Sequence, residues 1–328
     1  MDIVNKTGKT PLLNVMNGVT ISCPEPQLFS NLLTEIFGWE ILDEGSIDKK
    51  LENLWGINSS SSGNHWIILK SPDSIRGMIR IVKGAERNRT RPIGTRWSGV
   101  EIVVMQKVDE VYAEIVNHSL FEALSTPTTF DFSDVGANIH RGFHGKGPGK
   151  THLMFTMEVT KPTAGYEFPS SSTRVGHIFS VPLVSNNYTK SLNFYTNELN
   201  MISVLTDHLE EGLWHSTWNL PTGTPVDISI LKGNAPGFGH GGIELQGYSK
   251  EFIDPIPYNK NIFDGGTCLT SYTTDDIEGI YTTILNSPNA LSLSEPETIP
   301  YSPYNGCKAF CFLGPSGERL EIMENGWV

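Results

Sequence analysis

The chain has 328 residues, a length that suits two domains of ordinary size, each with its own hydrophobic core. Its 32 glycines and 20 prolines, with only 18% charged residues, favour a strand-rich protein over a helical bundle. The net charge of −12 argues against a nucleic-acid partner, and no apolar run reaches the roughly 18–20 residues that cross a bilayer. The N-terminus lacks the basic-then-apolar order of a signal peptide, so we expect a cytoplasmic protein with no membrane partner.

Four successive stretches of the chain show the same order of elements: a strand, a helix and then short strands. The first covers residues 16–83 and the second covers 98–159. The third begins at residue 175 and closes with a strand at 242–248, and the fourth covers 266–324. The period-2 runs and short connections predict four βαβββ units, which is an α+β architecture built by internal repetition.

The segment 161–174 separates the second unit from the third. It is rich in Pro, Ser and Thr and has neither a helical nor a strand period, so it is interpreted as a linker. This places the first two units in an N-terminal domain, residues 1–160, and the last two in a C-terminal domain, residues 175–328. The acidic excess lies mainly in the C-terminal half, because residues 166–328 hold 7 basic and 18 acidic side chains. An acidic half fits a cation site, and it fits a solvated acidic surface equally well.

Two short motifs of the C-terminal half carry a resemblance to a known family. Residues 175–178 (Val-Gly-His-Ile), with 191–195 (Ser-Leu-Asn-Phe-Tyr) downstream, are similar to an opening strand and helix of the vicinal oxygen chelate superfamily. Residues 314–322 (Gly-Pro-Ser-Gly-Glu-Arg-Leu-Glu-Ile) resemble its closing hairpin and strand. That superfamily includes glyoxalase I, methylmalonyl-CoA epimerase, extradiol dioxygenases, and fosfomycin and bleomycin resistance proteins. The resemblance implies paired units whose cup-shaped mixed sheets surround a divalent metal.

Carried onto this sequence, the resemblance implies a metal site in the C-terminal domain. His177 would come from the opening strand of the third unit, Glu244 from its closing strand, and Glu321 from the closing strand of the fourth. Thr267 or Cys268 stands near the fourth position, where the family most often has histidine. One imidazole and two carboxylates suit Zn, Fe, Mn, Ni or Co, and Glu244 or Glu321 could also accept a proton as a catalytic base.

Each of these residues has a structural alternative. His177 could be a hydrogen-bonded core histidine, and the two glutamates could face solvent in their alternating runs. Four further residues are expected to line the substrate cup of the C-terminal domain: His215, His240, Trp218 and Tyr304. The same aromatic side chains could equally be core.

The N-terminal half offers no matching ligand set. The equivalent positions are Val19, Arg80, Val100 and about Met154, so the first domain is expected to be a structural partner without metal. Its three histidines, His140, His144 and His152, lie in a stretch rich in glycine. We interpret that stretch as loop, with a metal site as the less favoured hypothesis.

Three functions remain open from the sequence. The first is a metal-dependent isomerase or lyase of the glyoxalase or epimerase type, acting on a small, largely apolar oxygenated molecule by metal-assisted proton transfer. The second is an extradiol-type ring-cleaving dioxygenase with a non-standard iron shell. The third is a non-catalytic small-molecule binding protein of the same fold. A homo-oligomer is compatible with all three.

Overall fold

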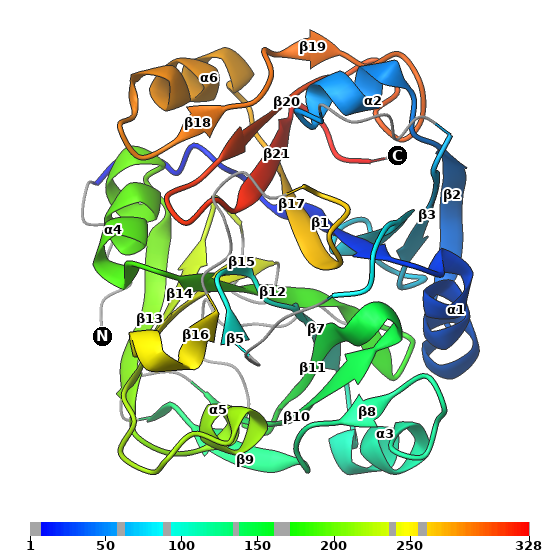
Figure 1. Cartoon of the computed structure of the whole chain (residues 1–328), viewed down its shortest axis with the longest axis vertical. Helices are drawn as coiled ribbons and strands as arrows, with labels where there is room; N and C mark the ends of the chain where they lie inside the picture. Colours follow the sequence, from blue (N-terminus) through cyan, green and yellow to red (C-terminus); the bar gives the residue numbers. More distant parts are fainter. Residues whose placement is uncertain are drawn as a thin grey trace.

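The computed structural model of the chain describes residues 8–57, 63–87, 93–133, 138–160, 171–235, 241–254 and 261–327. Its elements follow the predicted repeat of four βαβββ units, drawn in Figure 1. The first unit contains β1 (Met16–Cys23), α1 (Pro26–Asn31), the π-helix η1 (Leu32–Ile36), β2 (Glu40–Ser46), α2 (Lys49–Leu54), β3 (His65–Lys70) and β4 (Met78–Lys83). Two short strands then lead to the second unit: β5 (Ile93–Gly94) and β6 (Arg96–Trp97).

The second and third units adjoin along the chain. The second contains β7 (Val100–Val104), α3 (Val108–Ile115), β8 (Glu122–Ala123), β9 (Thr128–Asp131), β10 (Ile139–Gly147), the 3₁₀ turn η3 (Pro148–Lys150) and β11 (Thr151–Glu158). The third contains β12 (Val175–Ser185), α4 (Tyr188–Asn193), the π-helix η4 (Phe194–Glu198), β13 (Ile202–Leu209), α5 (Leu213–Trp218), β14 (Val226–Lys232) and β15 (Gly242–Tyr248). It is followed by η5 (Lys250–Phe252) and β16 (Ile253–Asp254).

The fourth unit completes the chain. It contains β17 (Gly266–Thr273), α6 (Ile277–Asn286), β18 (Leu291–Ser292), β19 (Glu297–Thr298), β20 (Lys308–Leu313) and β21 (Arg319–Met323). Its helix begins where the side chain of Asp276 accepts a hydrogen bond from the Gly279 amide at 2.9 Å, which is the local interaction that favours Asp before a first helical turn. Asp48 and Asn187 cap α2 and α4 in the same way.

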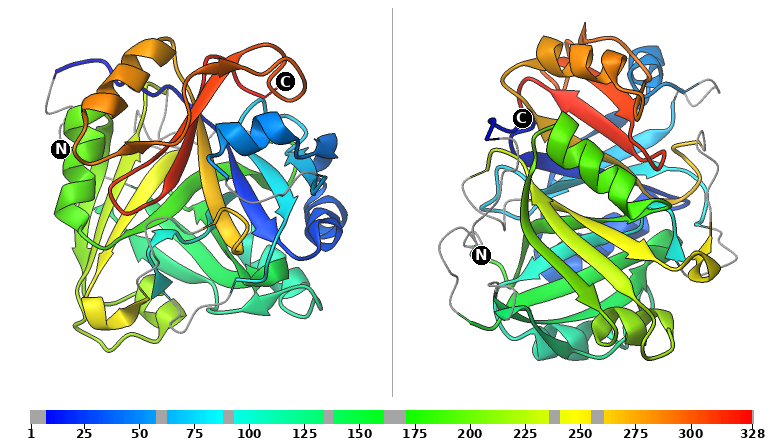
Figure 2. Two further views of the ribbon diagram at one scale, coloured as in Figure 1. Left: turned by 45° about the horizontal axis from the view of Figure 1, so that its top comes forward. Right: turned by 90° about the vertical axis from the view of Figure 1, so that its left-hand side faces the viewer.

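The four units combine into two mixed sheets, but not in the predicted pairs. The opening strand β1 of the first unit pairs antiparallel with β17 of the fourth, giving a 9-stranded sheet. The opening strand β7 of the second unit pairs antiparallel with β12 of the third, giving a 10-stranded sheet. Figures 1 and 2 show β1 (blue) lying beside β17 (orange), although they are at opposite ends of the chain. The expectation that each half of the chain forms its own cup is therefore wrong.

The reason lies in how each unit is built. Within a unit the opening strand runs parallel to the closing strand, as β1 does with β4 and β12 with β15. The other edge of the opening strand is left free, and any second opening strand can pair with it. The connections 84–99, 159–174 and 249–265 are all of similar length, so neither spacing nor pattern distinguishes neighbouring units from distant ones.

The hydrophobic residues form one shared core and two separate ones. The largest cluster joins one face of both sheets with helices of all four units, and includes Val19, Phe37, Phe155 and Ile322. The opposite face of the 9-stranded sheet carries a second cluster, which includes Trp55, Tyr304 and Trp327. The opposite face of the 10-stranded sheet carries a third cluster, which includes Phe132, Trp214 and Trp218. We call these two opposite faces the arginine cup and the carboxylate cup, after the groups at their centres described below.

No helix among the described residues has the length and apolar character needed to cross a bilayer. The cytoplasmic location and the homo-oligomer stay predictions.

The pairing of distant units predicts that neither half folds alone. A fragment of residues 1–165 and one of residues 166–328 would each lack half of both sheets, so each should unfold without a cooperative transition. Mixing the two should restore the transition of the intact chain, measured by circular dichroism during urea titration. A sharp transition from either fragment alone would contradict the pairing.

Candidate functional site

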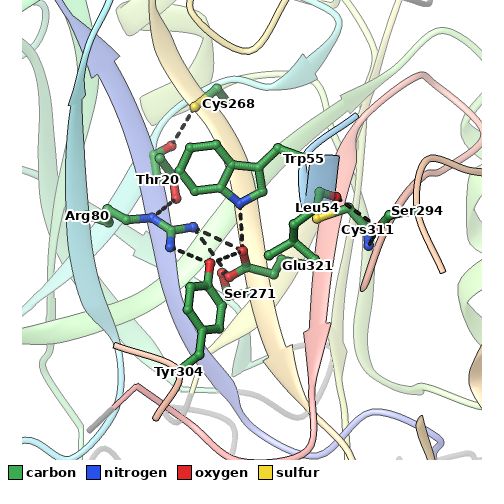
Figure 3. A network of polar contacts seen from close by, with 10 residues as sticks. All are labelled: Thr20, Leu54, Trp55, Arg80, Cys268, Ser271, Ser294, Tyr304, Cys311 and Glu321. Atoms are coloured by element: carbon green, nitrogen blue, oxygen red, sulfur yellow. Dashed lines mark hydrogen bonds and ion pairs between the residues drawn. The ribbon is translucent and has the colours of Figure 1, made fainter. Parts of the chain in front are cut away.

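The centre of the arginine cup is a buried ion pair. Arg80 on β4 and Glu321 on β21 are 1% and 0% exposed, and Arg80 Nη2 lies 3.2 Å from Glu321 Oε1. Arg80 Nε donates to Thr20 Oγ1 on β1 at 3.0 Å, and Ser271 Oγ on β17 donates to Glu321 Oε2 at 2.7 Å. Each opening and closing strand of the two paired units therefore contributes one polar side chain to this centre (Figure 3).

Three aromatic side chains, those of Trp55, Tyr304 and Trp327, pack against this network. Trp55 Nε1 donates to Glu321 Oε1 at 2.8 Å, and the Tyr304 hydroxyl donates to the same oxygen at 2.7 Å while accepting from Arg80 Nη1 at 2.8 Å. The rings of Trp55 and Trp327 lie 4.6 and 4.5 Å from the guanidinium carbon, within cation–π range. Burial alone would lower the pKa of Arg80, but Glu321 and Tyr304 outweigh it and hold that pKa above its ordinary value.

A divalent metal does not fit the arginine cup. The guanidinium of Arg80 already neutralises Glu321, and the remaining groups directed at that carboxylate are N–H and O–H donors. A cation there would meet a fixed positive charge without water between them. The arrangement instead makes this cup a closed, charge-balanced core.

The carboxylate cup has a different centre at the equivalent strand positions. Glu101 on β7 and Glu244 on β15 are 3% and 2% exposed, and their carboxyl groups hydrogen-bond to each other. Thr156 on β11 and Ser180 on β12 both donate to Glu101. Among the described residues no cationic side chain pairs with either glutamate, so this cup has two acids where the other has an acid and a base.

Neutral donors complete the surroundings of Glu244. Trp214 Nε1 donates to its Oε1 at 3.1 Å, and Gln246 Nε2 donates to the same oxygen. Burial, followed by the charge of Glu244, raises the pKa of Glu101 to about 8. Burial also raises the pKa of Glu244. Two carboxyl groups in contact can hydrogen-bond only when one of them is protonated, so the pair holds one proton near neutral pH.

A small cavity of about 30 Å³ lies against this pair. Apart from the two glutamates its walls are aromatic and aliphatic: Phe130, Phe132, His140, Phe179, Leu205, Trp214, Ile228 and Ile230. Phe130 is on β9 and Phe132 directly follows that strand; within the described residues β9 pairs with β10 alone, and the Phe130 ring stacks on His140 with centroids 5.6 Å apart. The cavity thus presents an acid pair to an apolar space, with a short edge strand as one wall.

The three histidines of the second unit lie on strands, which corrects their assignment to a loop. His140 and His144 are on β10, and His152 is on β11. The glycines between them permit close packing: a Cβ at Gly145, for example, would lie 2.0 Å from the Phe121 ring. Burial lowers the pKa of His140 to about 4 and that of His144 to about 3, so both rings are neutral at pH 7.

The structure does not bring the predicted metal ligands together. Glu244 lies in the carboxylate cup and Glu321 in the arginine cup. His177 is buried on β12 against the turn at Gly77, where Ile178 N donates to the Gly77 carbonyl at 3.2 Å. Among the described residues, no group of three or more His, Cys, Asp and Glu side chains could hold a metal ion.

The predicted substrate residues are also dispersed. His215 Nε2 is bonded to the Thr224 carbonyl at 2.7 Å, so it fixes α5 to the following loop. Trp218 packs on His152, with ring centroids 4.7 Å apart, and Tyr304 belongs to the arginine cup. His240 lies outside the described residues. Of the other three, none lines the cavity beside Glu101 and Glu244.

Sequence reasoning missed Glu101 and Ser180. Glu101 was missed by one residue, because Val100 was placed at the ligand position and a one-residue shift exchanges the two faces of a strand. Ser180 was missed because β12 has register shifts between residues 175 and 178 and between 178 and 180, so counting along the strand from His177 fails. The signal for Glu101 is a lone acid within the apolar run Val100–Val104.

Comparison with solved structures supports this architecture. A mutant of glyoxalase I from Zea mays is 15% identical, with 94% of this chain and 93% of that chain covered and a TM-score of 0.61. A "putative dioxygenase" from Bacillus subtilis subsp. subtilis str. 168 is 11% identical, with 97% and 87% covered and a TM-score of 0.59. Comparison of the sequence with family models and with curated proteins finds no match. The chain therefore has the vicinal oxygen chelate fold, as its motifs implied, in a two-sheet, four-unit form.

The buried ion pair of the arginine cup generates a stability prediction. Arg80→Met leaves Glu321 uncompensated and should lower the free energy of unfolding by about 3–5 kcal/mol. The double variant Arg80→Met/Glu321→Leu removes both charges and should recover most of that loss. Urea titration of the three proteins measures the difference.

Arg141→Met provides the control, because Arg141 forms a more exposed ion pair with Asp109. It should cost less than about 1 kcal/mol. A cost for Arg80→Met no larger than that of Arg141→Met would show that the buried pair contributes nothing.

The acid pair of the carboxylate cup generates a pH prediction. Between pH 4.5 and about 8 the folded protein keeps a proton that Glu101 releases in the unfolded chain. Stability from this group is therefore complete below pH 4.5 and is lost as the pH rises, by about 1.4 kcal/mol per pH unit. The double variant Glu101→Gln/Glu244→Gln lacks this proton. Its free energy of unfolding relative to wild type should therefore rise with pH at the same slope between pH 4.5 and about 8, measured by urea titration at several pH values. Parallel curves for the two proteins would contradict the shared proton, and exposed Glu122→Gln serves as the control.

Proposed function

We propose that the protein is an enzyme of the isomerase or lyase kind that moves a proton on a small, largely apolar oxygenated molecule. The observation that carries this proposal is the pair of buried carboxyl groups, Glu101 and Glu244, in contact with each other beside an apolar cavity. Proton-transfer catalysts need an acid and a base whose pKa values are separated by their environment, and this pair supplies both forms at once. The aromatic walls favour a substrate with an apolar body.

The residues define the roles. The ionised carboxyl group takes a proton from a carbon next to a substrate carbonyl, so that a C–H bond breaks and an O–H bond forms on the glutamate. The protonated carboxyl group donates a hydrogen bond to the carbonyl oxygen, where negative charge develops. Ser180 and Thr156 hold Glu101 in position, and Trp214 and Gln246 hold Glu244. Return of the proton to the same or a neighbouring carbon completes an epimerisation or isomerisation.

The side chains at the centre of the carboxylate cup do not support the metal-assisted form of this mechanism. In the carboxylate cup the ligand positions hold two glutamates, a serine and a threonine, and four N–H or O–H groups already point at the carboxylate oxygens. The dioxygenase alternative requires two histidines and a carboxylate, a set that these positions do not provide. We therefore assign the proton transfer to the protein's own acid pair.

Substrate entry requires movement of the cavity wall. The cavity of about 30 Å³ is smaller than a substrate, and Phe130 on β9 and Phe132 just after that strand form part of its wall. Because β9 bonds to one neighbouring strand among the described residues and is half-exposed, it is the wall that can shift at the lowest cost.

Proton exchange tests the proposal without knowledge of the natural substrate. Small aryl α-hydroxyketones are incubated with the protein in D₂O, and deuterium incorporation next to the carbonyl is followed by proton NMR. Wild type should accelerate the exchange, and Glu101→Gln and Glu244→Gln should each reduce it about 100-fold or more. Glu122→Gln, an exposed glutamate on β8, should match wild type.

Three results would overturn the proposal. Exchange at wild-type rate in both Gln variants would place the chemistry elsewhere. Saturable binding of these ketones with no exchange above background would identify a non-catalytic binding protein instead. Equimolar metal in purified wild type, lost in Glu101→Gln, would restore the metal-assisted mechanism.

A further inference from the structure

A second cavity, of about 40 Å³, lies beside the arginine cup, since its wall residue Cys268 donates to the Thr20 carbonyl, and it shares no lining residue with the cavity beside Glu101. Its walls come from β6, β17 and β21 and from the segment before β17, so it lies where parts of both sheets meet. The polar residues among these walls are Arg96, Arg319, Thr267, Glu318, Asp264 and Asn261. The proposed acid–base mechanism uses none of them.

Arg319 is the central group of this cavity. It is 8% exposed, its Nε has no hydrogen-bond partner, and within the described residues it forms no ion pair. Burial lowers its pKa, and the only groups that oppose this effect are the thiols of Cys311 and Cys268. A guanidinium this deeply buried is costly unless an anion compensates it.

Arg87 adds a second buried guanidinium behind the cavity. Its side chain packs against Gly266, and Gly265, which lines the cavity, touches its backbone. Arg87 Nη1 donates to the Ser98 carbonyl at 2.6 Å, whereas Nη2 has no partner. Burial lowers the pKa of Arg87 to about 10, with no carboxylate acting against it.

The two carboxyl groups in the cavity walls do not neutralise Arg319. Glu318 is fully buried and accepts from the Tyr195 hydroxyl at 2.7 Å and from Ser316 N at 2.8 Å. Burial raises the pKa of Glu318 to about 7, so it is partly protonated at neutral pH. Asp264 is half-buried in the cavity wall and is not among the groups that shift the pKa of Arg319. Counting Arg87 behind the walls, three guanidinium groups therefore face two carboxyl groups, of which Glu318 is partly protonated.

Two further observations indicate a built site. Thr267 Oγ1 is buried in the cavity wall and has no hydrogen-bond partner, so a hydroxyl donor accompanies Arg319. Arg96, which also lines the cavity, has a φ of 75°, in the left-handed region that non-glycine residues adopt at a cost.

We propose that this cavity binds a small oxyanion, a phosphate or carboxylate group, through Arg319, Arg96 and Thr267, with Arg87 adding positive charge from behind. Guanidinium groups match the geometry of such anions through paired N–H donors. A volume of about 40 Å³ admits an anionic head group and excludes a nucleotide or a large cofactor from the cavity itself. The site lies outside the acid pair's cup, so the proposal stands independently of the proposed activity.

Calorimetric titration of the intact chain tests the site. Inorganic phosphate and acetate are titrated separately at constant ionic strength, and saturable binding of one or both at one site per chain is expected. Binding of phosphate alone would assign the natural ligand to the phosphates, and binding of acetate alone to the carboxylates. Arg319→Met should weaken binding at least tenfold, whereas Arg141→Met, at an exposed ion pair, should leave it unchanged.

A stability readout separates binding from a merely structural role. In buffer without the anion, the melting temperature of Arg319→Met should be no lower than that of wild type, because the substitution removes an uncompensated buried charge. When the anion is added, the melting temperature should rise for wild type only. If Arg319→Met does not fold, Thr267→Val replaces it and should weaken binding several-fold. Absence of saturable binding of either anion to wild type, or wild-type affinity in these variants, would overturn the proposal.

Discussion

A polar group at the centre of a buried sheet must be compensated, and this constraint organises both halves of the molecule. In each sheet two opening and two closing strands meet, and each contributes one side chain to the same central position. The 9-stranded sheet compensates Glu321 with Arg80, and the 10-stranded sheet places Glu101 directly against Glu244. In the 9-stranded sheet the charge of Arg80 neutralises Glu321, whereas in the 10-stranded sheet a retained proton leaves one of the two carboxyl groups uncharged.

The two centres therefore have different roles, one in stability of the fold and one in the proposed chemistry. A guanidinium held between two indole rings and bonded to a carboxylate has no free capacity for a ligand, so the arginine cup stabilises the fold. An acid pair surrounded by neutral donors can release or accept a proton with little rearrangement. This second centre adjoins an apolar cavity, which is why the proposed chemistry is placed there.

The sequence predicted the repeated units and the closing strands well. Glu244 and Glu321 stand in alternating runs that end their units, and both do point into the centre of a sheet. The opening strands were harder, because Glu101 lies within an almost wholly apolar run and β12 has two irregularities of register. Periodicity is a reliable guide only where a strand is regular and its two faces differ.

The pairing of units could not be predicted from local pattern. All four opening strands present similar free edges, and the pairing of β1 with β17 depends on contacts between the ends of the chain. This one choice decides which side chains meet: it separates Glu244 from Glu321 and brings Glu101 to Glu244 and Arg80 to Glu321. For that reason, the metal site predicted from His177, Glu244 and Glu321 does not form.

The central claim is that Glu101 and Glu244 share a proton at neutral pH. Infrared difference spectroscopy between wild type and Glu101→Gln/Glu244→Gln measures this directly, because a protonated carboxylic acid has a carbonyl stretch that a carboxylate lacks. We expect one such band in wild type at pH 7, disappearing as the pH rises past about 8. A wild-type spectrum at pH 7 with carboxylate bands alone at these two positions would contradict the account.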